Sequence, residues 1–121
     1  MKTHGEKKRT WEESQEICNK HKASLVAIES QEDQSNLQTF LGQFGRHDYW
    51  TSGRRDSSGK YKWINNGNEI VYTNWYPGDP NGGHENCIAF IGNNNDSYNG
   101  KWGDYDCNAD LNIFCELSLN I

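Results

Sequence analysis

Four cysteines constrain the fold of this chain more than any other feature of its sequence. They are Cys18, Cys87, Cys107 and Cys115. No two of them form a Cys-x-x-Cys pair and none lies at zinc-finger spacing from a histidine, so a zinc site is not expected. An even number of cysteines in a small polar chain favours two disulfides and an oxidising compartment. The sequence alone allows three pairings.

The length and charge of the chain limit the classes of protein to which it can belong. Its 121 residues suit one compact domain, which we place at residues 9–121 after an N-terminal lead-in at residues 1–8. Only 33% of the residues are hydrophobic, but 5 Trp, 6 Tyr and 4 Phe compensate in part because each ring buries a large area. The net charge of −5 argues against nucleic acid as a partner, since such proteins need a basic surface.

The sequence favours a secreted, extracellular protein. No apolar run approaches the roughly 20 residues that cross a bilayer, so no membrane span is expected. Residues 2–10 are too polar for a signal peptide, and we expect the signal of a secreted protein to have been removed. Asn95-Asp96-Ser97 is a potential glycosylation acceptor, which supports secretion only weakly because such triplets are common by chance.

Two helices are predicted in the first half of the chain. Thr10 and Glu13 fit a capping box, which predicts a helix over roughly residues 11–22. Ser30, followed by three polar residues, predicts the start of a second helix. The core-facing side of this second helix is an apolar stripe at i, i+3, i+4 and i+7, formed by Leu37, Phe40, Leu41 and Phe44.

The second half of the chain reads as strands and loops, so the predicted fold class is α+β. Asn65-Asn66-Gly67-Asn68 is a hairpin-type turn signal between two of the predicted strands. Residues 73–86 and 92–101 are long polar stretches, and long loops in a compact domain are usually functional. The predicted strands are residues 24–28, 49–53, 61–64, 69–72, 87–91, a short segment near Trp102, and 113–117.

Residues 79–106 contain a dense set of hard oxygen donors. Calcium takes six to eight oxygens from carboxylates, amide and backbone carbonyls and water. Several of the donors lie in one loop beside Pro80 and nearby glycines, and a tight loop can aim such side chains at one point. Composition alone leaves a merely solvated acidic loop as an equal alternative, and the pattern is not that of an EF-hand. The donors are Asp79, Asn81, Glu85, Asn86, Asp96, Asp104 and Asp106.

Several segments of the chain stand in an order and spacing that are typical of one family. They are Thr10-Trp11 through Cys18, residues 23–30, Thr73-Asn74-Trp75, Asp79-Pro80-Asn81, Glu85-Asn86-Cys87, Lys101-Trp102-Gly103-Asp104 and Phe114-Cys115-Glu116. Through them the sequence resembles a C-type lectin-like domain over roughly residues 9–118. The resemblance implies two helices flanking small antiparallel sheets, a long calcium- and sugar-binding loop, and the disulfides Cys18–Cys115 and Cys87–Cys107.

The resemblance also implies a binding site. In sugar-binding members of this family one calcium ion takes two vicinal hydroxyls of a hexose, and its protein ligands hydrogen-bond the same hydroxyls. Carried over position by position, the metal ligands and sugar contacts are Asp79, Asn81, Glu85 and Asp104. Pro80 resembles the family's cis-proline. An acid followed by Asn resembles the order found in mannose-, glucose- and fucose-binding members, with galactose as the alternative.

Two residues depart from the family pattern. Asp79 replaces Glu or Gln, so its carboxylate reaches one methylene less far. Gly103 stands where the family usually has Asn, which removes one metal ligand. The resemblance therefore implies a weakened calcium site, which the substitution Gly103→Asn is expected to strengthen. His84, next to Glu85, is a further candidate for a side contact with the sugar.

The sequence leaves other functions to be weighed against sugar binding. Gly103 favours an alternative in which a lectin-like domain has lost sugar binding and recognises a protein. An enzyme is not expected, since the chain has no Gly-x-Ser-x-Gly elbow and no His-Glu-x-x-His segment. Single lectin sites bind weakly, so a homo-oligomer would restore strength through avidity. Residues 49–53 are similar to those of invertebrate, particularly insect, secreted members, in which recognition of microbial or self glycans in innate immunity is common.

Overall fold

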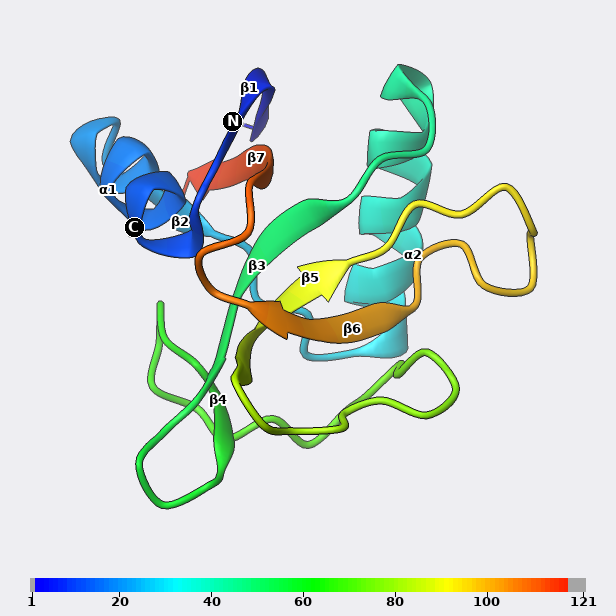
Figure 1. Ribbon diagram of the computed structural model, residues 1–121. Helices are drawn as coiled ribbons and strands as arrows, with labels where there is room; N and C mark the ends of the chain where they lie inside the picture. Colours follow the sequence, from blue (N-terminus) through cyan, green and yellow to red (C-terminus); the bar gives the residue numbers. More distant parts are fainter. Residues whose placement is uncertain (1, 118–121) are drawn as a thin grey trace.

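The computed structural model describes residues 2–117, and for residues 2–7 and Glu85 it describes the backbone alone. Two helices flank a sheet of seven strands (Figure 1). The helices are α1 (Trp11–Lys20) and α2 (Gln31–Leu41), and the short 3₁₀ helix η1 (Gly42–Phe44) follows α2. The strands are β1 (Lys2–Arg9), β2 (Ala23–Leu25), β3 (Tyr49–Arg55), β4 (Tyr61–Trp63), β5 (Glu85–Phe90), β6 (Trp102–Asp106) and β7 (Leu111–Leu117).

The sheet is mixed, and its order is β1-β7-β3-β5-β6, with β2 paired to β7 and β4 paired to β3. All of these pairs are antiparallel except β3 with β7, which meet in parallel at Tyr49 and Asn112. The predicted α+β class is confirmed. The small antiparallel sheets implied by the resemblance are joined through this parallel contact into one sheet.

The N-terminal residues belong to the sheet. Residues 2–9 form β1, which pairs antiparallel with β7. The domain boundary suggested after residue 8 stays a prediction. Pairing at the edge of a sheet uses backbone N–H and C=O groups and does not require apolar side chains. A polar terminal segment therefore gives no sequence signal when it adds a strand in this way.

Local capping explains why the two helices begin where the sequence predicts. The Thr10 hydroxyl accepts from the Glu13 backbone N–H at 3.3 Å, and the Glu13 carboxylate accepts from the Thr10 backbone N–H at 3.1 Å. Ser30 caps α2 by accepting from the backbone N–H of Asp33 at 3.0 Å. Helix α1 ends at Lys20, before the predicted residue 22, and Lys22 has a positive φ of 56° that ends the helical backbone.

Two predicted strands are shorter in the structure or missing from it. Residues 69–72 form no strand and contribute only an isolated bridge between Lys62 and Glu69. The preceding turn is held by side chains, because Asn66 and Asn68 both donate to the carboxylate of Glu29. The predicted strand 24–28 stops at Leu25, after which the backbone carbonyl of Val26 accepts from Ser52 of β3.

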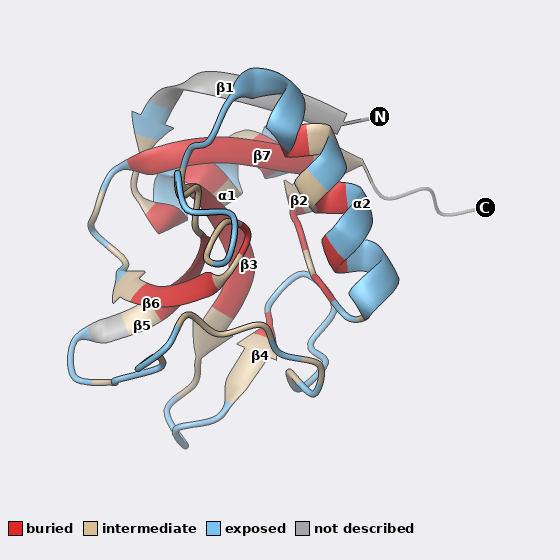
Figure 2. Cartoon of the chain, turned by 90° about the vertical axis from the view of Figure 1, so that its right-hand side faces the viewer, coloured by how far each residue is buried: buried red, intermediate tan, exposed pale blue. Residues whose placement is uncertain are grey.

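The core divides into two apolar clusters. Figure 2 shows buried stretches along β3, β6 and β7. Trp102 is fully buried in the first, and its indole N–H donates to the buried side chain of Gln34 in α2 at 2.9 Å. Trp75 packs against this cluster. The second cluster surrounds both disulfides, Cys18–Cys115 and Cys87–Cys107, and so both pairings implied by the resemblance are confirmed.

Candidate functional site

The predicted ligands come from two neighbouring parts of the fold. Asp79 and Asn81 lie in the loop that precedes β5, Glu85 begins β5, and Asp104 lies in the middle of β6. Strands β5 and β6 are paired antiparallel, with Ile88 opposite Asp104. The loop thus leads directly into the strand that lies beside the one carrying Asp104 (Figure 1).

Asp104 joins the loop to the sheet. Its side chain is buried, with 2% of the residue exposed, and Oδ2 accepts from the backbone N–H groups of Asn81 at 2.9 Å and of Gly82 at 2.8 Å. Oδ1 is buried and has no hydrogen-bond partner among the described residues. One oxygen of the carboxylate therefore orders the loop, while the other remains available to a cation or a hydrogen-bond donor.

Asp79 lies next to the same point of β6. The Asp79–Pro80 peptide bond is cis, as the resemblance implied, and the Asp79 backbone N–H donates to the carbonyl of Tyr76 at 2.9 Å. Oδ2 of Asp79 is 3.2 Å from the position that a Cβ at Gly103 would occupy. Asp79 therefore lies beside β6 at the residue that immediately precedes Asp104.

The remaining predicted residues differ in their exposure and in their contacts with the site. Asn81 is exposed and its backbone is held by Asp104. The side chain of Glu85 lies outside the described residues, so its predicted role stays a prediction. His84 is exposed and lines a polar cavity of about 350 Å³ together with Thr10, Glu12, Arg54, Asn86, Asp106, Cys107 and Asn108. None of the described contacts joins His84 to Asp79, Asn81 or Asp104.

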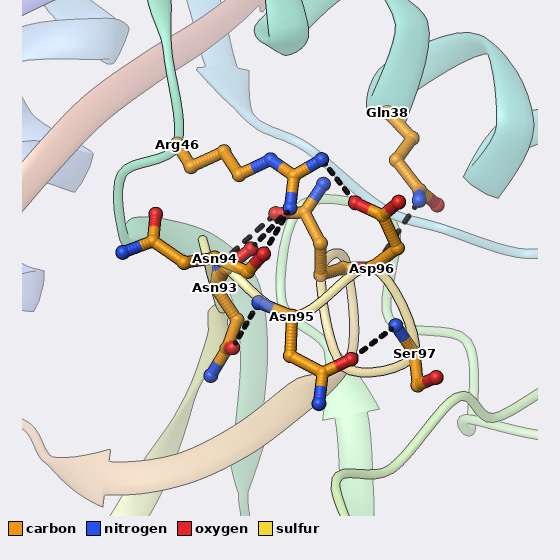
Figure 3. A network of polar contacts seen from close by, with 8 residues as sticks. Gln38, Arg46, Asn93, Asn94, Asn95, Asp96 and Ser97 are labelled. Atoms are coloured by element: carbon orange, nitrogen blue, oxygen red, sulfur yellow. Dashed lines mark hydrogen bonds and ion pairs between the residues drawn. The ribbon is translucent and has the colours of Figure 1, made fainter.

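Three acidic residues that the sequence could have offered as further metal ligands are engaged elsewhere. Asp96 forms an ion pair with Arg46, which also donates to the backbone carbonyls of Asn93 and Asn94 and so fixes the tip of the loop after β5 (Figure 3). Asp56 accepts from Ser58 and Lys60 and pairs with Lys62, and these contacts lower its pKa. Asp106 is exposed and caps a turn at Asn108.

Arg55 is a residue of the site region that the sequence did not point out. Its Nε donates to Oδ1 of Asn86 at 3.0 Å, and one terminal nitrogen donates to the backbone carbonyl of Gly83 at 2.9 Å. These partners lie 28 and 31 residues away in the chain, so no local spacing reveals the contact. Only knowledge that the end of β3 lies beside this loop identifies Arg55.

The donor set suits a hard cation. Asp79, Asn81 and Asp104 offer carboxylate and amide oxygens, which are the ligands that calcium prefers. No cluster of three or more His, Cys, Asp or Glu is present among the side chains that the structure describes, a set that leaves out Glu85. The fit to calcium therefore rests on the chemistry of these donors and on the unpartnered buried oxygen of Asp104.

Comparison with known proteins places this geometry in a family. The model of the lectin C-type domain matches residues 7–117. The chain belongs to the C-type lectin domain family. Human C-type lectin domain family 10 member A is 30% identical over an alignment of 118 residues, and the match covers 91% of this chain and 34% of that protein. The chain spans between 22% and 39% of the length of four curated relatives that it matches.

Solved structures of C-type lectins share the fold. The SPL-1–GlcNAc complex matches with a TM-score of 0.81 and 27% identity, covering 94% of this chain and 84% of that one. The Ca²⁺-independent C-type lectin SPL-2 from Saxidomus purpuratus matches with a TM-score of 0.77 and 29% identity, covering 94% and 83%. The relatives are lectins and receptors, which confirms the prediction that the chain is not an enzyme. Among the described helices, none has the length and apolar character needed to span a membrane.

Proposed function

We propose that this domain binds carbohydrate in a calcium-dependent manner, with Asp79, Asn81, Glu85 and Asp104 as ligands of a single calcium ion. The observation that carries the proposal is the carboxylate of Asp104. A buried acceptor without a donor costs about 1–3 kcal/mol, and more when it is charged. Oδ1 of Asp104 is such an acceptor, and it lies in the strand against which the loop with Asp79 and Asn81 is held.

The calcium ion and the side chains around it would have separate roles in binding the sugar. When bound, a calcium ion would supply positive charge and open coordination positions for two vicinal hydroxyls of a hexose. The carboxylates of Asp79, Glu85 and Asp104 would accept hydrogen bonds from those hydroxyls, and the amide of Asn81 can also donate one. The acid-then-Asn order at residues 79 and 81 favours mannose, glucose and fucose, with galactose as the alternative.

The neighbours support sugar binding more directly than they support calcium. The SPL-1 structure is a complex with GlcNAc, whereas SPL-2 is described as a Ca²⁺-independent C-type lectin. The fold is therefore compatible with lectins of both kinds, and the metal has to be tested separately from the sugar. Gly103 favours the second candidate function, recognition of a protein, because it provides no side-chain ligand beside Asp104.

The test is retention of the purified domain on immobilised mannose, galactose and GlcNAc in calcium, followed by elution with EDTA. We expect retention on mannose or GlcNAc and release by EDTA for the wild type. Asp104→Asn should flow through, while Asp110→Asn, which changes an exposed acid elsewhere, should behave as the wild type. Retention that survives EDTA would overturn the calcium part, and no retention on any sugar would leave protein recognition as the function.

We further propose that the domain acts outside the cell, as a secreted protein or as the extracellular part of a longer one, in glycan recognition of the innate-immune type. Two disulfides support an oxidising compartment. Self-association would raise the avidity of a weak single site. Sedimentation at several protein concentrations, with and without calcium, tests that part.

A further inference from the structure

We propose that Arg55 is a positioning residue of the binding site, whose guanidinium group holds residues 82–86 in the shape in which the loop meets Asp104. The inference rests on the proposed function, because it assigns to Arg55 an effect on calcium binding. It also makes a claim about the metal-free loop that can be tested without calcium.

The contacts of Arg55 all converge on one short segment. Arg55 is the last residue of β3, is half-buried, and reaches across to the loop that precedes β5. It donates from Nε to the side chain of Asn86 at 3.0 Å and from Nη2 to the carbonyl of Gly83 at 2.9 Å. Nη1 lies 3.3 Å from the position that a Cβ at Gly82 would occupy. One planar group thus lies against three positions of the same loop.

This loop has little backbone structure of its own. Gly82 and Gly83 have consecutive positive φ angles of 75° and 72°, a backbone conformation that favours glycine. Ordering a glycine costs more conformational entropy than ordering any other residue. Within the loop the backbone forms a turn at Gly83 and His84. Side chains of opposite charge also hold the loop, since Asp104 accepts from its N–H groups and Arg55 donates to its carbonyl.

The two bonds of Arg55 bracket the residue proposed as the fourth ligand. Gly83 and Asn86 stand on either side of Glu85, so Arg55 restricts the backbone that carries Glu85 at both ends. A planar guanidinium can reach two acceptors in different directions, whereas a lysine ammonium is a compact charge on a flexible stem. We therefore expect lysine to replace the charge of Arg55 without replacing its function.

The direction in which calcium affinity changes on removing Arg55 distinguishes a positioning role from an effect of its charge. A cation close to a metal site repels the metal, so removing Arg55 would strengthen calcium binding if its charge were what mattered. If Arg55 acts by ordering the loop, its removal weakens binding. Residues that orient metal ligands typically change metal affinity by about 10- to 100-fold when mutated. We expect Arg55→Ala to lower calcium affinity about 10-fold and Arg55→Lys to lower it nearly as much.

The neighbouring arginine provides a matched control. Arg54 carries the same charge, but it lies 4.9 Å over the ring of Trp11 and 3.7 Å from the carboxylate of Glu12, both in α1. Calcium binding would be measured by titration calorimetry, with calcium chloride alone, for the wild type, Arg54→Ala, Arg55→Ala and Arg55→Lys. Arg54→Ala should bind as the wild type. Unchanged or tighter binding in Arg55→Ala, or full rescue by Arg55→Lys, would overturn the inference.

A second measurement keeps the test independent of the metal. In EDTA, hydrogen exchange of the amides at residues 82–86 should be faster in Arg55→Ala than in the wild type, while that of residues 49–53 should not change. If the wild type binds no calcium, the proposed function fails and the exchange result alone decides the role of Arg55. Equal exchange at residues 82–86 in both proteins would refute the positioning role, whatever calcium does.

Discussion

Replacing Asp104 with asparagine separates the two tasks that the structure gives to this side chain. Oδ2 accepts from the backbone N–H groups of Asn81 and Gly82, whereas Oδ1 is buried without a partner among the described residues. The amide keeps one acceptor for the loop, but it loses the negative charge and the second oxygen. We therefore expect Asp104→Asn to remove a calcium ligand and also to destabilise the calcium-free domain.

Two opposing effects set the stability of this variant in EDTA. Hydrogen bonds to a charged group contribute about 1.5–3 kcal/mol, and those to a neutral one about 0.5–1.5 kcal/mol, so neutralising Asp104 costs about 2–3 kcal/mol over its two bonds. Removing the buried charge favours the variant, but the amide puts its NH2 group in place of Oδ1, where a buried donor without an acceptor costs about 1–3 kcal/mol and offsets that gain. The expected net loss in the free energy of unfolding is about 2–3 kcal/mol, measured by urea denaturation.

The effect on calcium is separate and is measured as a shift in Tm. An ion present at 100 times its Kd stabilises the folded state by about 2.7 kcal/mol. With about 4 °C per kcal/mol for a domain of this size, the wild type should gain about 10 °C. If Asp104→Asn lowers the affinity about 100-fold, the same calcium adds only about 0.4 kcal/mol, or about 2 °C. Asp110→Asn is the control, and an Asp104→Asn protein that keeps the full calcium shift would refute the assignment of Asp104 as a ligand.

Three further perturbations test other parts of the structure. The sequence suggested that Gly103→Asn would strengthen the calcium site, but a Cβ at this position would come within 2.8 Å of a tyrosine ring and 3.2 Å of a neighbouring carboxylate. We therefore expect Gly103→Asn to lower the free energy of unfolding in urea by about 1–3 kcal/mol and not to tighten calcium binding. Replacing Cys18 and Cys115 with alanine should lower the free energy of unfolding by about 4 kcal/mol, since the disulfide closes a loop with a sequence separation of 97 residues; an undiminished urea midpoint would contradict this. Burial raises the pKa of Tyr49 to about 12 from 10.0, so its neutral form favours the folded state below pH 10, and that contribution is lost as the pH rises toward 12. Tyr49→Phe should therefore lose less stability than the wild type between pH 9 and pH 11.5, and parallel losses would argue against a buried tyrosine as the cause.

The parts of the fold that depend on local chemistry were predictable from the sequence. Thr10 and Ser30 cap their helices through side-chain oxygens three residues from the N–H groups they bind, so the pattern and the contact occupy the same few residues. Strand β1 was not predictable, because backbone pairing at a sheet edge leaves no side-chain signature. Residues 69–72 were predicted as a strand because they follow a hairpin-type turn signal, yet Val71 is 85% exposed and that turn is held by asparagine side chains.

The site was predictable only in part, for a similar reason. Resemblance to a family named its ligands. The structure places Asp79 beside Gly103, shows Asp104 accepting from the backbone of Asn81, and shows the cis bond at Pro80. The family resemblance could not show which groups hold the loop, because the contacts of Arg55 and Asp104 join residues more than 20 positions apart. Steric room at Gly103 was equally hidden, since it depends on the neighbouring side chains of the folded chain.

Ordering of the loop before the metal binds bears on how an altered site can still function. Fixing the backbone of one residue costs about 1–2 kcal/mol. Because Asp104 and Arg55 already hold the loop, less of this cost falls on calcium binding, and the affinity for calcium is higher. The shorter acid at Asp79 and the missing ligand at Gly103 weaken the proposed site, and this ordering offsets part of the loss. Asp104→Asn would remove a ligand while keeping an acceptor for the loop, whereas Arg55→Ala would loosen the loop while keeping every ligand. Comparing hydrogen exchange with calcium affinity in these two variants therefore separates the loss of a ligand from the loss of order.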